Sequence, residues 1–141
     1  MSSCERGGHM GSIAVSVLIT SLLVAVLPLA AADRQSAEER AAIQLKLSEN
    51  LYKARRYGDA LGTVDKALKE DSKFVPAHQL RGQILVSMDL LEEAIKEFDR
   101  TLQLDPAYTE ARNWRGYALV QLSRFDEAMK EYDRALEDKT F

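Results

Sequence analysis

The chain has 141 residues, a formal net charge of −3, 46% hydrophobic and 29% charged residues. This ordinary globular composition excludes wholesale disorder and collagen-like repeats. A single cysteine excludes a disulfide framework and a multi-cysteine metal site, and the near-neutral charge offers no basic face for nucleic acid. We therefore expect one domain with no metal, no cofactor and no nucleic-acid partner.

The first feature along the chain is an apolar stretch. No Asp, Glu, Lys or Arg occurs over residues 7–32, and Ile13 to Leu27 are apolar or small throughout. Pro28 follows, and Ala30 and Ala32 form an A-x-A site. These are the parts of a cleaved secretory signal, which predicts export to a periplasmic or extracellular space.

The alternative is a retained single-pass anchor over residues 13–32, because a bilayer span needs roughly 20 residues. The basic charge ahead of it is weak, since Glu5 offsets Arg6. Both interpretations place the rest of the chain outside the cytoplasm, although the flanking charge leaves the opposite orientation of an anchor open. Cys4 precedes the apolar run, so it does not indicate a lipoprotein cleavage site.

The chain then repeats with a period of 34 and no insertion or deletion. After a lead-in over 33–40, the domain 41–141 divides into units 41–74, 75–108 and 109–141. A fixed period of this length predicts stacked structural repeats. The columns in register are Ser48, Gly82 and Gly116; Tyr57, Leu91 and Phe125; Ala60, Ala94 and Ala128; Val64, Phe98 and Tyr132; and Leu68, Leu102 and Leu136.

Each unit reads as two helices of about 13 residues, because its apolar residues recur at helical spacing. Leu91, Ala94 and Phe98, for example, lie on one helical face. The small-residue column lets the paired helices approach closely. The breaks between paired helices fall at residues 55–56, 88–89 and 122–124.

Helix ends are also marked in the sequence. Pro76 suits the first turn of a helix, where its missing N–H costs nothing. Pro106 follows Asp105 and stops the helix before it. Ser36 and Glu39 have the S-x-x-E spacing of a capping box, which predicts a first helix that starts near Ala37.

These units resemble the tetratricopeptide repeat family. The resemblance rests on the period, the spacing of Gly82 and Leu85, the Ala-x3-Phe motif of Ala94 and Phe98, and Pro106 at a unit's end. It covers about 70% of the chain. It implies an all-α fold, a right-handed α-solenoid of three helix–turn–helix units with six helices, after the apolar N-terminal segment.

The sequence departs from the family pattern at some positions. Ser48 replaces the glycine of the first unit, and Gly58 and Gly62 lie inside its second helix. An interior glycine costs about 1 kcal/mol relative to alanine, so we expect this unit to be the most weakly helical. The aromatic residue that the family has near the start of each first helix is replaced by Gln44, His78 and Arg112.

The resemblance implies that the first helices line a concave face that binds a peptide or partner protein. The register places amides and two tyrosines there, which suits the main chain and apolar side chains of an extended peptide. The alternative is a solvated face that binds nothing. The predicted groove residues are Leu45, Glu49, Tyr52, Lys53, Gln79, Gln83, Val86, Ser87, Asn113, Tyr117, Val120 and Gln121.

Some family members hold C-terminal carboxylates of a partner with a Lys/Asn clamp on this face. The matching positions here are Leu45, Glu49, Gln83, Asn113 and Tyr117. None of them is a cation, and Glu49 would repel a carboxylate. We therefore expect no carboxylate clamp.

The last helix offers a second candidate surface. Solenoids usually end with a polar capping helix, and this sequence ends at Phe141, shortly after its sixth predicted helix. Met129, Tyr132 and Leu136 are therefore expected to be partly uncovered. We expect them to form a docking edge for another copy of the chain, giving a homo-oligomer, or for another protein. The alternative is a frayed end.

Nothing in the sequence indicates an enzyme. His78 is the one histidine outside the N-terminal segment, and no nucleotide-binding or metalloprotease motif occurs. Glu92 and Glu93 fit the first turn of a helix, where acidic residues are favourable. Trp114 is either a partner anchor or a core residue.

The expected function is a non-enzymatic protein-interaction module outside the cytoplasm. The alternative is a membrane-anchored subunit of a larger assembly, in which residues 13–32 stay in the bilayer.

Overall fold

The computed structural model describes residues 33–34 and 36–137, and the chain divides into two compact units, 1–36 and 37–141. The predictions of a signal or an anchor fall on residues 1–32 and lie outside the described residues. Within the described part of the chain, no helix has the length and apolar character needed to cross a membrane.

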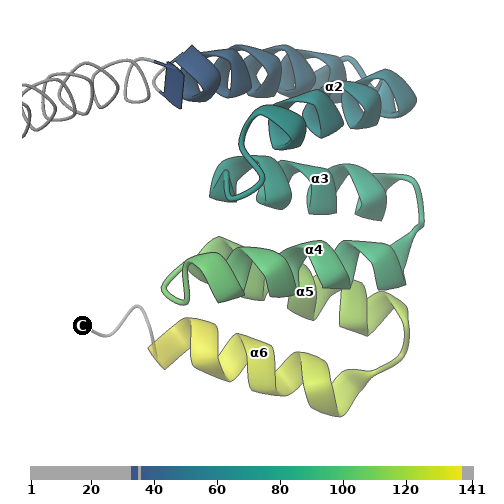
Figure 1. The fold of residues 1–141 in the computed structure, drawn as a ribbon. Coiled ribbons are helices and arrows are strands. Elements are labelled where there is room, and N and C mark those ends of the chain that lie inside the picture. Colours follow the sequence, from purple (N-terminus) through teal and green to yellow (C-terminus); the bar gives the residue numbers. More distant parts are fainter. Residues whose placement is uncertain (1–32, 35, 138–141) are drawn as a thin grey trace, which may run out of the picture. The chain divides into compact units, whose positions relative to one another are not determined.

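The larger unit is built from helices that stack in sequence order (Figure 1). Its described residues form six helices and no strand, which confirms the all-α fold of three helix–turn–helix units. The helices are the N-terminal helix, which covers 36–53, α2 (Tyr57–Glu70), α3 (Val75–Ser87), α4 (Leu91–Leu104), α5 (Thr109–Gln121) and α6 (Phe125–Glu137).

Two expected helix ends are confirmed and one expected cap is wrong. As expected, α4 ends at Leu104, before Asp105 and Pro106. Pro76 lies in the first turn of α3, where no N–H is needed. Ser36, however, does not cap the first helix. It is itself helical, as are Asp33 and Arg34, and its hydroxyl donates a hydrogen bond of 2.7 Å to the carbonyl oxygen of Asp33. A capping residue would have non-helical backbone angles.

The three turns inside the units share one backbone geometry. Arg55, Asp89 and Ser123, one period apart, have φ values of 59°, 62° and 59°. After the N-terminal helix, the N–H of Arg56 bonds to the carbonyl of Leu51 at 2.9 Å, and the same bond recurs after α3 and α5. This is the Schellman motif, which usually has glycine at the left-handed position. The turns lie where the sequence predicts them, without that glycine.

The small-residue column brings the paired helices together. A Cβ atom on Gly82 would lie 2.7 Å from Cζ of Phe98, which is fully buried, and one on Gly116 would lie 2.8 Å from Cζ of Tyr132. In the first unit, the buried Ser48 hydroxyl instead donates to the carbonyl oxygen of Ala60 at 2.8 Å. A serine therefore fits the first pair because its polar atom has a partner.

The first unit shows no break in its second helix. The helix α2 has 14 residues, the same length as α4, although it contains Gly58 and Gly62. Nothing lies within 4 Å of a Cβ atom built at either glycine. Tertiary packing of Ala60 and Val64, both fully buried, holds the helix despite its low intrinsic propensity.

Charged side chains join neighbouring units at the same register. Arg81 of α3 pairs with Asp65 of α2 at 2.8 Å and also with Glu97 of α4. One period later, Arg115 of α5 lies 2.7 Å from Asp99 and 2.8 Å from Glu131. On both α3 and α5, an arginine thus bridges the second helix of the preceding unit and that of its own unit.

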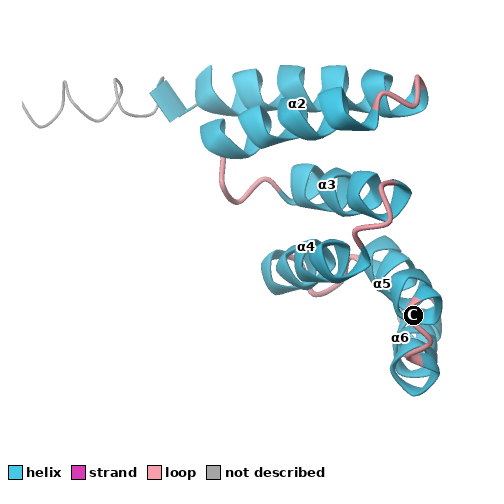
Figure 2. Cartoon of the chain, turned by 90° about the vertical axis from the view of Figure 1, so that its right-hand side faces the viewer, coloured by secondary structure: helices cyan, strands magenta, loops and turns pink. Residues whose placement is uncertain are grey.

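Successive helices pack against one another from α2 to α6. Figure 2 shows α5 and α6 seen nearly end-on beside α4. The core between the units is built on small residues at the contacts, such as Ala77 and Ala111, and on larger ones, such as Ile84 and Leu119, all fully buried. The packing of this core determines which side of each first helix remains exposed to solvent.

Candidate functional site

The first helices of the units border two pockets. The polar pocket, of about 380 Å³, is lined by the N-terminal helix, α3 and the start of α5. The aromatic pocket, of about 530 Å³, lies between the C-terminal half of α3 and α5. The polar pocket residues are Glu49, Tyr52, Lys53, Pro76, Gln79, Leu80, Gln83, Tyr108 and Glu110.

Gln79 is the unusual residue of the polar pocket. It is only 3% exposed, and neither its amide nitrogen nor its amide oxygen has a hydrogen-bond partner among the described residues. A buried amide without partners costs about 1–3 kcal/mol. Gln79 is therefore a donor and an acceptor that the fold itself leaves unused at the wall of a pocket.

The charges around Gln79 are mixed. Glu49 pairs with Lys46 at 3.1 Å, and Gln83 donates a hydrogen bond of 3.0 Å to Glu110. Burial raises the pKa of the Tyr108 hydroxyl, with a further contribution from the negative charge of Glu110, so this hydroxyl stays protonated and can donate. The pocket offers neutral donors and acceptors rather than a strong charge of one sign.

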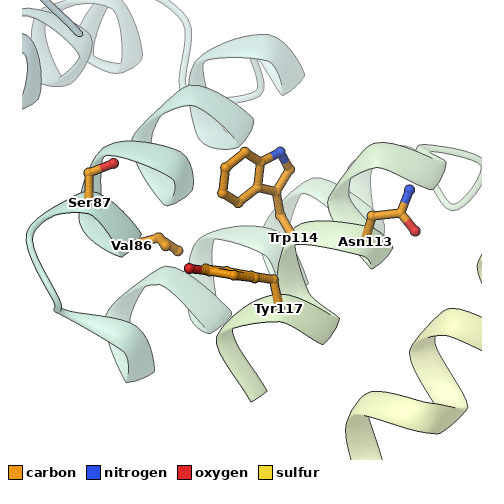
Figure 3. A pocket seen from close by; sticks show the side chains of 5 residues that line it. All are labelled: Val86, Ser87, Asn113, Trp114 and Tyr117. Carbon is orange, nitrogen blue, oxygen red and sulfur yellow. The ribbon is translucent and has the colours of Figure 1, made fainter. Parts of the chain in front are cut away.

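The aromatic pocket is framed by two rings of α5 (Figure 3). The rings of Trp114 and Tyr117 meet edge to face, with centroids 5.9 Å apart. Val86 and Ser87 of α3 form the opposite wall, and Asn113 lies at the side. Such a lining suits an apolar or aromatic side chain, with one amide at the rim.

The two pockets meet along α3. Its residues Gln79 and Gln83 line the first, and Val86 and Ser87, one turn further on, line the second. The Ser87 hydroxyl donates to the Tyr52 hydroxyl at 3.2 Å, which ties the N-terminal helix to the end of α3. We call the surface formed by these two neighbouring pockets the groove.

The structure brings most of the predicted groove residues to these pockets. Leu45 is an exception, because it is partly buried beside Ala41 and Ala60 and lines neither pocket. Gln79 is buried rather than a solvated amide. Val120 and Gln121 are exposed and line neither pocket. Those that line a pocket are Glu49, Tyr52, Lys53, Gln79, Gln83, Val86, Ser87, Asn113 and Tyr117.

Sequence reasoning missed several groove residues. Trp114 both lines the aromatic pocket and packs against the cluster around Leu85 and Phe98, so it is neither a pure anchor nor a pure core residue. Tyr108 and Glu110 precede or begin α5, outside the helical face that the register defines. The signal that was available for Trp114 is its position three residues before Tyr117, which is one helical turn.

The three residues of the predicted docking edge differ in their exposure. Met129 is 61% exposed and Leu136 is 63% exposed. Tyr132 is only partly exposed, since its ring covers Gly116 and packs with the cluster around Leu119. Met129 and Leu136 lie on the exposed face of α6, and Tyr132 lies on the face that packs against α5.

Both ring nitrogens of His78 have hydrogen-bond partners within the fold. Its Nδ1 lies 2.8 Å from a carboxylate oxygen of Glu97, and its Nε2 lies 3.1 Å from the carbonyl oxygen of Ser72. The hydrogen bond to Glu97 raises the pKa of His78 above its usual value. Burial would raise the pKa of Glu97, but the hydrogen bond from His78 and the charge of Arg81 outweigh it and lower that pKa. The described residues hold no cluster of three metal-ligating side chains.

Comparison with known proteins agrees with this architecture. A model of the tetratricopeptide repeat family matches residues 45–108 and 80–140. The chain belongs to the tetratricopeptide repeat family. No curated protein matches it.

Solved tetratricopeptide repeat structures share the fold at low identity. The second such domain of Spaghetti (RPAP3), bound to the HSP90 peptide SRMEEVD, has a TM-score of 0.72 and 21% identity, over 75% of this chain and 97% of that one. The Arabidopsis OM64 domain has a TM-score of 0.72 and 18% identity, over 74% and 86%. MamA has a TM-score of 0.69 and 22% identity, over 72% of this chain and 59% of its own.

Proposed function

We propose that this protein is a non-enzymatic interaction module that binds an extended segment of a partner protein in the groove. The observation that carries the proposal is Gln79, a residue of the polar pocket whose buried amide has no partner among the described residues. A peptide main chain offers an N–H and a C=O at each residue, which are the groups that a free amide can bind. The bound state would satisfy a group that the fold leaves unsatisfied.

The aromatic pocket supplies the second part of the recognition. An apolar or aromatic side chain of the peptide would lie between Trp114, Tyr117 and Val86. Aromatic residues are frequent binding hot spots because they bury much area with few rotatable bonds. Asn113, one period after Gln79, lies at the rim and offers a second amide. The expected ligand is thus an extended segment with an apolar anchor.

The related Spaghetti domain was solved with the acidic peptide SRMEEVD, which supports a peptide ligand in general. The groove chemistry here favours a different sequence. Glu49 and Glu110 line the polar pocket, with Lys53 as its one cation. Because these carboxylates would oppose a chain-terminal carboxylate, we propose an internal or weakly charged peptide segment as the ligand.

The test starts from a random peptide library selected on the immobilised protein, followed by fluorescence polarisation with the selected peptide. Gln79→Leu keeps the volume but removes the amide, and we expect affinity to fall about tenfold. Trp114→Ala should weaken binding further, by removing the apolar wall. Gln103→Leu, an exposed position on α4, is the matched control and should change little. Equal affinity of Gln79→Leu, Trp114→Ala and the unchanged protein would disprove the proposal.

The proposal includes a location outside the cytoplasm, supported by the apolar stretch Ile13 to Leu27 and the A-x-A site that ends at Ala32. A membrane-anchored assembly subunit is the alternative. The intact mass of the protein from soluble and membrane fractions separates them. A soluble form that starts at Asp33 supports an exported module, and a full-length form in the membrane supports the anchored subunit.

A further inference from the structure

The outer face of α6 repeats a surface that is covered elsewhere in the molecule. On α4, Leu91 and Ile95 are only 8% and 7% exposed, because they pack with Ala118 and Leu119 of α5. One period later, Phe125 and Met129 of α6 are 59% and 61% exposed. The same columns that bind a following first helix within the stack are therefore open on α6.

An aspartate on this face of α6 is also left open, although its equivalents on α2 and α4 are paired. Asp65 of α2 pairs with Arg81 of α3, and Asp99 of α4 pairs with Arg115 of α5. Asp133 is the third member of this column, and it is exposed and has no ion-pair partner among the described residues. Each second helix thus presents a carboxylate to the arginine of the next first helix, and on α6 that carboxylate is unused.

The helices that cover this surface inside the molecule share a pattern. Both α3 and α5 place a fully buried alanine at the contact, Ala77 and Ala111, and an arginine four residues later. A third contact residue follows three positions after the arginine, Ile84 or Ala118, also fully buried. The complementary helix therefore reads Ala-x3-Arg-x2-Ala/Ile.

A second copy of this chain does not supply that pattern. Its N-terminal helix has Ile43 at the alanine position and Leu47 at the arginine position. Isoleucine is too bulky for a contact at which both internal units have alanine, and leucine cannot pair with Asp133. The N-terminal helix of a second copy therefore lacks both the small residue and the arginine of this pattern.

We propose that the outer face of α6, formed by Phe125, Met129, Asp133 and Leu136, binds an amphipathic helix of a partner protein that carries the Ala-x3-Arg-x2-Ala/Ile pattern. The helix would lie on α6 as α5 lies on α4, with its arginine on Asp133. This surface is separate from the groove, so the protein can hold an extended peptide and a helix at once.

The probe is a synthetic peptide with the sequence of α5, TEARNWRGYALVQ, held helical by a staple that replaces Asn113 and Tyr117. A staple is needed because a free helix of this length is marginal in water. We expect saturable binding to the full-length protein, measured by isothermal titration. Met129→Glu should abolish it by adding a charge to the apolar contact.

A charge exchange tests the register. Asp133→Arg should weaken binding about tenfold, and a peptide with aspartate in place of Arg115 should restore it in this variant only. Glu93→Arg, an exposed site on α4, is the control and should bind as the unchanged protein does. No binding of the original peptide, or equal binding by Asp133→Arg, would overturn the proposal. Concentration-dependent self-association that Met129→Glu removes would also overturn it, by showing a second copy as the occupant.

Discussion

Gly82 lies directly against the ring of Phe98, with no room for a side chain between α3 and α4. A Cβ atom at this position would approach Cζ of Phe98 to 2.7 Å, and Phe98 is fully buried. Gly82→Ala should therefore lower the free energy of unfolding by about 2 kcal/mol, since an overpacked core must shift. Urea denaturation measures this value. Gly116→Ala should cost less because Tyr132, which it meets, is only half-buried and can move.

Gly58 and Gly62 present the opposite case. A Cβ atom at either site meets nothing within 4 Å, and both lie inside the helix α2. Each change to alanine should raise the free energy of unfolding by about 1 kcal/mol, because alanine loses less backbone entropy on folding. A lower stability of Gly62→Ala in urea would show that the glycine is needed for a contact that the structure does not contain.

The left-handed turns hold some strain. Arg55 has φ of 59°, a conformation that costs a residue with a Cβ atom about 1 kcal/mol relative to glycine. Arg55→Gly should therefore stabilise the protein by up to about this amount, as seen in its thermal midpoint. Asp89→Gly should gain less, because aspartate tolerates this region better. Lys66→Gly inside α2 is the control and should destabilise.

Arg115 compensates a buried charge. The side chain of Glu131 is only 4% exposed, and it pairs with Arg115 at 2.8 Å and with Arg134 at 3.3 Å. Arg115→Met should cost about 3 kcal/mol, because it removes the shorter of these two pairs. Adding Glu131→Leu should recover much of this loss. Arg124→Met breaks the exposed pair with Glu127 and should change the unfolding midpoint little.

The stability of the protein should depend on pH through His78. Both of its ring nitrogens face acceptors, the carboxylate of Glu97 and the carbonyl of Ser72, so the doubly protonated ring satisfies both. Its pKa is raised in the folded state, chiefly by the Glu97 hydrogen bond. Its contribution is therefore fully present below the unfolded pKa of about 6.5 and is lost as the pH rises through the higher folded pKa.

Unfolding midpoints in urea between pH 5 and 9 check this dependence. The unchanged protein should lose stability above about pH 6.5, and His78→Gln should be flatter over this range. A second loss is expected in acid, because the pKa of Glu97 is lowered and its stabilisation disappears as the pH falls through that value. An identical pH profile for His78→Gln would show that the histidine stays neutral in the fold.

Much of the fold can be predicted from local features of the sequence. The period of 34, the helical spacing and Pro76 define six helices and their turns, because helical periodicity and backbone restrictions act within a few residues. The capping box at Ser36 failed because a short motif cannot show that the residues before it are also helical. The left-handed turn at Asp89 carries no glycine, so only the backbone bonds reveal it.

What the sequence by itself determined is the repeat, the helix pairs and the face on which the groove lies. Only the tertiary structure decided that Leu45 and Tyr132 are partly buried, that the Gln79 amide is buried without a partner, and that Trp114 frames a pocket. The physical reason is that register fixes a residue's direction on its own helix. Burial depends instead on how closely the neighbouring helices approach, and small residues such as Gly82 set that distance.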